Sequence, residues 1–162
     1  MNETTPVVSV LLSVRNGMPY LPEAVESIVG QTLTDWELIV NDNESSDGSV
    51  AWLEQRARTE PRLRLVRSGQ DLGAAGGLNY AFAHARASWL AIIDADDRAF
   101  PERLERQLDF VAAHPELVAT SCFAYYIDTQ GRHLGGTFTD LTTRAAFERY
   151  WAAEEPVILL HP

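Results

Sequence analysis

The sequence predicts an α/β fold in which a mainly parallel β-sheet is flanked by helices. Short apolar runs alternate along the chain with segments whose apolar residues recur at helical spacing. Strands that alternate with helices are joined by right-handed crossovers, which place the strands parallel in one sheet. The length of 162 residues suits one domain, and no repeat or low-complexity linker interrupts the sequence. We therefore predict a single α/β domain over residues 1–162.

The chain begins with a predicted strand–helix–strand unit. Apolar runs at residues 7–12 and 36–40 predict the two strands. Between them, apolar side chains at helical period predict a helix over residues 21–29. Pro22 suits the first helical turn, where its missing N–H costs nothing, and Gly30 suits the helix end.

The same alternation continues through the middle of the sequence. It predicts a helix at residues 50–58, a strand at 63–66, a helix at 75–85 and a strand at 89–93. These four elements extend the pattern of parallel strands and crossover helices.

The last third of the sequence is less regular. Pro101 opens a predicted helix that ends before His114, and a strand is predicted at residues 117–127. The remaining expectations are a turn at residues 128–131, a short segment at 133–139, a weaker helix at 141–153 and a strand at 158–162. Because the chain stops inside that last strand, we expect the fold to be incomplete at the C-terminus.

Composition and charge exclude several classes of protein. Hydrophobic content of 46% and charged content of 22% are ordinary for a soluble globular protein. The net charge of −10 argues against a nucleic-acid partner, because phosphate backbones are bound by clustered cations. The apolar run at residues 7–14 is too short to span a bilayer and has no basic region before it, so it is not a signal peptide. The single Cys122 fits a reducing compartment, and we expect a cytoplasmic protein.

Polar and acidic residues directly follow three of the predicted strands. They occupy residues 13–17, 41–48 and 94–97. In an open parallel sheet, ligands bind at the carboxyl ends of the strands. We therefore expect these three segments to meet at one edge of the sheet and to form a site there.

The acidic run of Asp94, Asp96 and Asp97 admits two interpretations. Three carboxylates within four residues would repel one another, and a Mg²⁺ or Mn²⁺ ion is the usual reason to tolerate them. Such ions bind few carboxylates and bridge them to phosphates, which indicates a diphosphate ligand. Equally, the first two could merely end a strand while Asp97 caps the next helix. Taken alone, residues 42–48 suit a turn, and the glycines of residues 73–77 suit close packing of a helix on the sheet.

The combination of motifs is more specific than any one of them. The motifs are Ser13-Val14-Arg15-Asn16-Gly17, Asn41-Asp42-Asn43 with Ser45-Ser46-Asp47-Gly48, Leu72-Gly73 with Leu78-Asn79, and Ile93-Asp94-Ala95-Asp96-Asp97 followed by Pro101-Glu102-Arg103-Leu104. In this order, and over essentially the whole chain, the sequence resembles the family 2 glycosyltransferases. The resemblance implies the GT-A fold, which is Rossmann-like.

The resemblance also implies the site and the reaction. The implied donor-binding residues are Ser13, Arg15, Asn16, Asp42, Asn43, Gly73, Asn79, Asp94 and Ala95, and the implied ligands of Mg²⁺ or Mn²⁺ are Asp96 and Asp94. The implied reaction is an inverting transfer of a sugar from a nucleotide-diphosphate donor, with a UDP-type donor favoured. The acceptor would be the hydroxyl of a glycan or lipid-linked molecule in polysaccharide biosynthesis, which leaves open a peripheral membrane association of the full-length protein.

The sequence departs from the family pattern at three places. Arg15 stands where many members carry an aromatic residue, and Asn43-Glu44 replaces a common Asp-Gly. Gly77-Leu78-Asn79 stands where many members have Ala-Arg-Asn, so one arginine that could contact the diphosphate is absent. The first two departures bear on which base the donor carries.

The catalytic base is not assigned to any residue of this sequence. In the family a later acidic motif supplies it, and we expect that motif beyond Pro162, so that this chain binds donor and metal and transfers little or no sugar. The alternative function is a non-catalytic nucleotide-sugar-binding module. A receiver domain is disfavoured because the sequence has no lysine, and a nucleotidyltransferase because residues 13–17 are not a basic glycine-rich loop.

Overall fold

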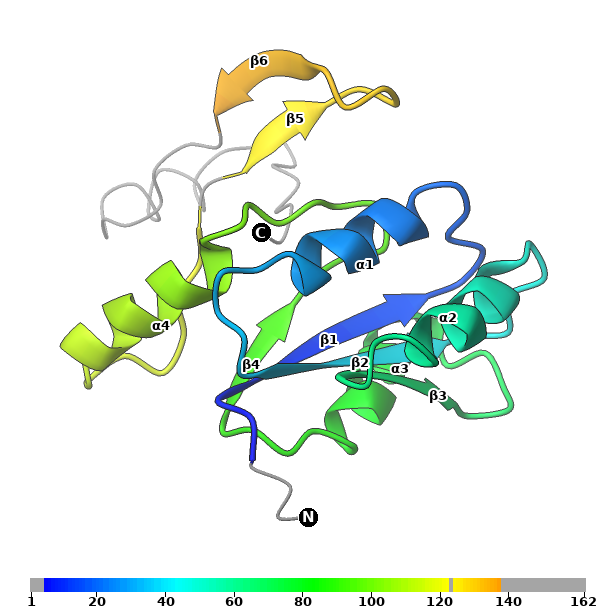
Figure 1. The fold of residues 1–162 in the computed structure, drawn as a ribbon, viewed down its shortest axis with the longest axis horizontal. Helices are drawn as coiled ribbons and strands as arrows, with labels where there is room; N and C mark the ends of the chain where they lie inside the picture. The colour runs from blue at the N-terminus through cyan, green and yellow to red at the C-terminus, as the bar shows by residue number, and fades with distance from the viewer. Residues whose placement is uncertain (1–4, 123, 138–162) are drawn as a thin grey trace, which may run out of the picture. The chain divides into compact units, whose positions relative to one another are not determined.

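The computed structural model describes residues 5–122 and 124–137 of the chain. The chain divides into two compact units, Met1–Pro115 and Glu116–Pro162, which Figure 1 colours from blue to green and from yellow onward. The single domain expected from the length of the chain stays a prediction.

The first unit contains a four-stranded parallel sheet. Its strands are β1 (Val8–Val14), β2 (Trp36–Asp42), β3 (Leu63–Arg67) and β4 (Trp89–Ile92), in the order β3-β2-β1-β4. From β1 the chain moves outward to β2 and β3, and then crosses to the other side of β1 to form β4. The direction of winding therefore changes between β1 and β4, which is where open α/β sheets bind ligands.

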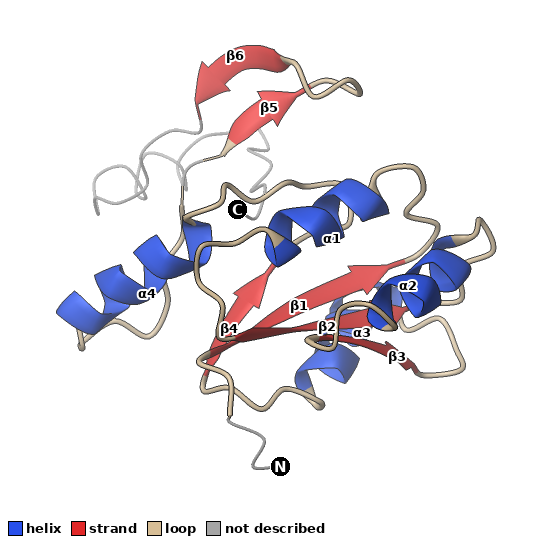
Figure 2. Cartoon of the chain, in the orientation of Figure 1, coloured by secondary structure: helices blue, strands red, loops and turns tan. Residues whose placement is uncertain are grey.

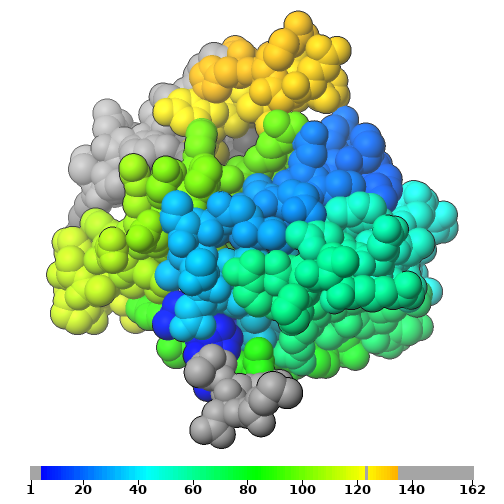
Figure 3. Space-filling model, in the orientation of Figure 1, coloured from blue at the N-terminus to red at the C-terminus, as the bar shows by residue number. Residues whose placement is uncertain are grey.

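Helices cover both faces of this sheet. They are α1 (Leu21–Val29), α2 (Ser49–Ala57), α3 (Gly73–Phe82) and α4 (Arg103–Ala113). α1 and α2 lie on one face and α3 on the other, and the side chains of α1 and α2 hide the sheet in the space-filling view (Figures 2 and 3). The mainly parallel sheet flanked by helices that the sequence predicts is therefore confirmed. Within the described part of the chain, no helix is long and apolar enough to cross a membrane.

The side chains of β1 point alternately to the two faces of the sheet and belong to two separate core clusters. Val10 and Leu12 belong to the larger cluster, which also contains the buried face of α1, Leu53 of α2 and Leu104 of α4. Leu11 points the other way and packs with Ile39 and Ala81 of α3. Burying one such side chain contributes about 1.5–3 kcal/mol. These two clusters fix the sheet between its helices and hold the strand ends in place.

The predicted helix over residues 21–29 is confirmed as α1, with the same bounds. Leu21, Ala24, Val25 and Ile28 are completely buried, which is the spacing of one helical face. A proline lies in the first turn and Gly30 directly follows the helix, as predicted.

The second unit contains an antiparallel pair of strands, β5 (Tyr125–Ile127) and β6 (His133–Thr137). The predicted turn between them is confirmed, since the Gly131 N–H donates to the Asp128 carbonyl at 2.8 Å. The predicted strand at residues 117–127 is wrong except for its last three residues. In the described part of residues 117–124 no neighbouring strand supplies a ladder, and Val118 is 93% exposed. The elements expected at residues 141–153 and 158–162 lie outside the described residues.

Candidate functional site

The carboxyl ends of β1, β2 and β4 lie at one edge of the sheet, as the sequence predicts. β1 ends at Val14 and β2 at Asp42, and these two residues are partners in the parallel register. On the other side of β1, the Ile93 N–H donates to the Leu11 carbonyl at 3.1 Å. β1 and β2 each continue two residues past their predicted ends, because polar side chains do not interrupt a ladder of backbone hydrogen bonds.

A pocket of about 210 Å³ opens at this edge. It is lined by Ser13, Arg15, Asn43, Asp71, Gly73 and Ala74. The lining combines the end of β1, the residue after β2 and the beginning of α3. All but two of these residues belong to the predicted donor-binding set. Asp71 and Ala74 were not predicted from the sequence, although both adjoin the Leu72-Gly73 motif.

Asn43 joins the three elements that form the pocket. Its Nδ2 donates to Ser13 Oγ at 3.1 Å and to the Gly73 carbonyl at 2.9 Å. Its Oδ1 accepts from Asn41 Nδ2 at 3.1 Å and from the Leu72 N–H at 3.3 Å. Only 3% of Asn43 is exposed. Because an amide both donates and accepts here, Asn43 holds the first turn of α3 against the ends of β1 and β2.

Gly77 allows α3 to approach the strand ends closely. A Cβ atom at this position would lie 2.1 Å from Ser13 Oγ and 2.6 Å from Asn43 Nδ2, far inside contact distance. The interpretation of these glycines as close helix-to-sheet packing is thus confirmed at Gly77. Asn79, on the same helix, is exposed and is not among the residues that line the pocket.

The charged residues of the pocket are paired with each other. The Arg15 guanidinium donates to Asp71 Oδ2, and both side chains are partly exposed. Asp71 Oδ1 accepts from the Gly73 N–H at 2.9 Å. Gly73 has φ = 67°, a backbone conformation that suits glycine. Asp71 therefore fixes the beginning of α3 and holds Arg15 at the same time.

Asp42, the predicted base- and ribose-binding acid, is completely buried. Both of its carboxylate oxygens lie 3.3 Å from the Ser45 N–H, which donates to them. Arg67 Nε, from the end of β3, lies 3.6 Å from Asp42 Oδ2. The structure thus places Asp42 directly before the pocket residue Asn43 but covers its carboxylate with the loop that follows and with Arg67.

Asn16, also in the predicted donor set, joins two loops. Its Oδ1 accepts from the Ser46 N–H at 2.8 Å, and its backbone is left-handed with φ = 55°. Next to it the Met18 N–H donates to Asp47 Oδ2 at 2.8 Å. A hydrogen bond from the Ser49 hydroxyl, helped by backbone N–H groups, holds the pKa of Asp47 below its usual value. The loops after β1 and β2 are therefore bound to each other by polar contacts.

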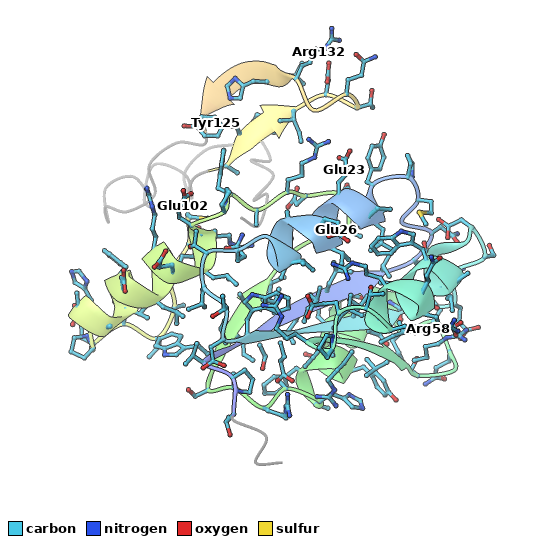
Figure 4. All side chains as sticks on the ribbon, in the orientation of Figure 1. Glu23, Glu26, Arg58, Glu102, Tyr125 and Arg132 are labelled. Atoms are coloured by element: carbon cyan, nitrogen blue, oxygen red, sulfur yellow. The ribbon has the colours of Figure 1, made fainter. Side chains whose placement is uncertain are left out.

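The acidic run after β4 forms a turn. The Asp97 N–H donates to the Asp94 carbonyl at 3.2 Å. The following helix, α4, has Glu102 at its N-cap (labelled in Figure 4), so the interpretation of Asp97 as the cap of that helix is wrong. Ala95 packs on the core, and a Cβ atom at Gly17 would lie 3.6 Å from its own. The turn therefore lies beside the loop after β1.

The carboxylates of Asp94 and Asp96 suit a hard divalent ion that takes its other ligands from water and phosphate. Both residues are exposed, and neither side chain forms a hydrogen bond or salt bridge with another described residue. Mg²⁺ is often bound by one or two carboxylates plus substrate phosphates. No group of three or more His, Cys, Asp or Glu residues that could hold a metal occurs within residues 5–122 and 124–137. The two carboxylates therefore fit an ion that is shared with a diphosphate. The described residues do not enclose an ion with protein ligands alone.

Several curated proteins similar to this chain are named as glycosyltransferases. The putative glycosyltransferase EpsE of Bacillus subtilis (strain 168) is 36% identical over 110 residues, covering 67% of this chain and 40% of EpsE. The putative teichuronic acid biosynthesis glycosyltransferase TuaG of the same organism is 32% identical over 111 residues, covering 68% of this chain and 44% of TuaG. The chain thus spans less than half the length of these relatives.

Solved structures of similar fold include two with bound nucleotide sugars. The mannosyltransferase PcManGT from Pyrobaculum calidifontis, in complex with GDP-Man and Mn²⁺, has a TM-score of 0.60 and 30% identity, covering 67% of this chain and 33% of that one. S. aureus TarS 1-349 in complex with UDP-GlcNAc has a TM-score of 0.62 and 23% identity, covering 67% of this chain and 32% of that one. The second likeness shows the fold alone. Together they confirm the GT-A (Rossmann-like) fold.

A family model described as Glycosyl transferase family 2 matches residues 9–157, which is most of the chain. The match includes the strand-end edge, the pocket and the acidic turn described above. The protein therefore belongs to glycosyl transferase family 2, as its motifs predict.

Proposed function

We propose that this chain is the donor-binding part of an inverting glycosyltransferase that moves a sugar from a nucleotide diphosphate to an acceptor hydroxyl. The observation that carries the proposal is the polar pocket at the strand-end edge, with the exposed carboxylates of Asp94 and Asp96 on the neighbouring loop. The names of the relatives and the nucleotide sugars in the two solved structures support it.

The pocket residues suit the nucleoside end of the donor. The Ser13 hydroxyl and the Asn43 amide offer hydrogen-bonding groups, and the volume of about 210 Å³ suits part of a nucleotide sugar rather than all of it. We propose a UDP-type donor, for which the complex of TarS with UDP-GlcNAc offers a precedent in the same fold. The phosphate next to the nucleoside would then adjoin the pocket, and the rest of the diphosphate and the sugar would extend toward Asp94 and Asp96.

In the proposed reaction the acceptor oxygen attacks the anomeric carbon as the bond from that carbon to the diphosphate oxygen breaks. The nucleoside diphosphate departs with the bonding electrons, and the hydroxyl proton passes to a base. Asp94 and Asp96 would hold Mg²⁺ or Mn²⁺, which when bound stabilises the negative charge of the leaving group. The name of TuaG supports an acceptor in polysaccharide biosynthesis, either a glycan or a lipid-linked molecule. The lone Cys122 supports a cytoplasmic location.

The metal-binding role of Asp96 can be tested by thermal unfolding. UDP with Mn²⁺ is expected to raise the melting temperature of the wild type, because ligand at 100 times its Kd adds about 2.7 kcal/mol of stability. Asp96→Ala is expected to lose most of that rise. Asp109→Ala is the matched control, because Asp109 is an exposed carboxylate on α4, outside the pocket lining and the acidic turn.

Two results would contradict this assignment. Equal melting of the wild type and Asp96→Ala in the presence of UDP and Mn²⁺ would remove Asp96 from the metal site. An equal loss in Asp109→Ala would show that net charge alone explains the effect. Calorimetric titration of Mn²⁺ with and without UDP then tests whether the ion needs the diphosphate to bind, as its two-carboxylate site predicts.

A further inference from the structure

The pocket contains one positive and one negative side chain, and they neutralise each other. Arg15 is the cation and Asp71 the anion, joined as a salt bridge. The other polar side chains of the lining, Ser13 and Asn43, are neutral. A nucleoside diphosphate carries several negative charges, so this pocket presents no net charge to attract it while the salt bridge is intact.

Another anion can readily replace Asp71 as the partner of Arg15. The side chain of Arg15 is 57% exposed and that of Asp71 is 37% exposed, and ion pairs with this access to water contribute little stability. Asp71 also forms a hydrogen bond that does not involve Arg15, because its Oδ1 accepts from the Gly73 N–H at 2.9 Å. Arg15 can therefore leave Asp71 while Asp71 stays fixed at the beginning of α3.

We infer that Arg15 binds a phosphate group of the donor in competition with Asp71, an inference that rests on the proposed function. Guanidinium forms strong paired hydrogen bonds with phosphate oxygens, so a diphosphate can replace the carboxylate. Asp71 stays beside the bound phosphate and repels it. Asp71 is thus a residue that sets the affinity of the pocket for phosphate-bearing ligands and favours release of the nucleoside diphosphate after transfer.

This role differs from that of a salt bridge which merely supports the loops. A supporting pair is broken equally by loss of either partner, so both losses would change ligand affinity in the same direction. Competition predicts opposite changes, because removing Asp71 frees the cation and removes a repelling charge, whereas removing Arg15 leaves only the repelling charge.

The experiment compares Arg15→Gln and Asp71→Asn by calorimetric titration with UDP at one fixed Mn²⁺ concentration. Asparagine keeps an Oδ1 that accepts from the Gly73 N–H, so the beginning of α3 is preserved. Asp71→Asn is expected to tighten UDP binding about three- to tenfold, and Arg15→Gln to weaken it by a similar factor. Binding of uridine, which lacks phosphate, is expected to stay unchanged in both variants when followed by ligand-detected NMR.

A second salt bridge provides the control. Arg56 and Glu26 form an ion pair between α2 and α1, away from the pocket lining (Glu26 is labelled in Figure 4). Arg56→Gln and Glu26→Gln are expected to leave UDP affinity unchanged. If the wild type binds UDP and both pocket variants shift in the same direction or not at all, the competition is overturned and the donor function stands. If neither UDP nor GDP binds to the wild type or to any variant, the donor function fails and the competition with it.

Discussion

Glu44 adopts a left-handed backbone conformation, φ = 61°, in the loop after β2. This region costs a residue with a Cβ atom about 1–2 kcal/mol, and glycine adopts it freely. The resemblance to family 2 glycosyltransferases implies that glycine is common at this position. Glu44→Gly is therefore expected to raise the free energy of unfolding by about 0.5–1 kcal/mol, measured by urea denaturation.

Asn16 provides the matched control for Glu44. Its φ of 55° is also left-handed, but asparagine tolerates this region and its Oδ1 accepts from the Ser46 N–H at 2.8 Å. Asn16→Gly is expected to lower stability by about 0.5–1.5 kcal/mol, because the hydrogen bond is lost. A lower stability for Glu44→Gly would show that the side chain of Glu44 outweighs the strain of its backbone.

Single residues also show what sequence can and cannot reveal about the site. Ser13, Arg15 and Asn43 were predicted because strand ends bind ligands and the motif order matches a family. The role of Asp71 depends on a contact with Arg15, 56 positions away, which no local spacing reveals. The burial of Asp42 likewise depends on how its loop folds back over it.

At the scale of elements, the approach of α3 to the strand ends depends on Gly77. A methyl group there would collide with Ser13 Oγ and Asn43 Nδ2, the two atoms that join β1 to the residue after β2. Gly77→Ala is therefore expected to lower the free energy of unfolding by about 1–3 kcal/mol, despite the better helix propensity of alanine. UDP affinity, measured by calorimetry on folded protein, is expected to fall more than tenfold, because the pocket loses its Asn43 network.

Gly76→Ala is the control that distinguishes the collision at Gly77 from the general effect of replacing a glycine of α3 by alanine. Its added methyl group would meet the side chain of Leu72 at 2.9 Å and would not touch Ser13 or Asn43. Gly76→Ala is expected to lower stability to some degree and to leave UDP affinity near that of the wild type. Equal affinities for Gly76→Ala and Gly77→Ala would mean that close contact at Gly77 is not what shapes the pocket.

How well each element could be predicted from the sequence depended on what it packs or pairs with. α1 was found because its apolar period matches the face that it buries, and β1 and β2 were found because their continuous apolar runs match burial on both faces. In the described part of residues 117–124 the predicted strand failed, because an apolar run forms a strand only where a neighbour completes its ladder and no described strand does so there. β1 and β2 exceeded their predicted ends because pairing between backbones does not depend on side-chain polarity.

In the first unit, a buried polar network and the pocket lie at opposite ends of the sheet. The pocket lies at the carboxyl ends of the strands, whereas Glu37 lies near the amino end of β2. Only 1% of Glu37 is exposed, and it accepts from Ser9 Oγ at 2.7 Å and from Arg86 Nε at 2.9 Å. Arg64 Nη1 donates to it at 3.3 Å. Through Glu37, residues of β1, β2, β3 and the connection to β4 are joined.

Glu37 should make the stability of this unit depend on acid pH. Burial raises the pKa of Glu37, but hydrogen bonds from Ser9 and from Arg86, with the charge of Arg86, outweigh it and hold the pKa below the usual value. A lowered folded pKa stabilises the protein above the ordinary glutamate value of about 4.3, and this stability is lost as pH falls through the folded pKa. Glu37→Gln is expected to cost about 1–3 kcal/mol at pH 7, because charge-assisted hydrogen bonds are lost.

The difference between wild type and Glu37→Gln isolates this one group, because other carboxylates titrate equally in both proteins. Urea denaturation at a series of pH values is expected to show a difference that is constant from pH 7 to about 5 and shrinks below about 4.3. Glu26→Gln, which breaks a surface pair with Arg56, is expected to stay within about 0.5 kcal/mol of the wild type at every pH. A difference for Glu37→Gln that does not change with pH would mean that the variant loses packing and hydrogen bonds rather than the charge. UDP affinity is expected to be unchanged in folded Glu37→Gln, since the network touches none of the residues that line the pocket.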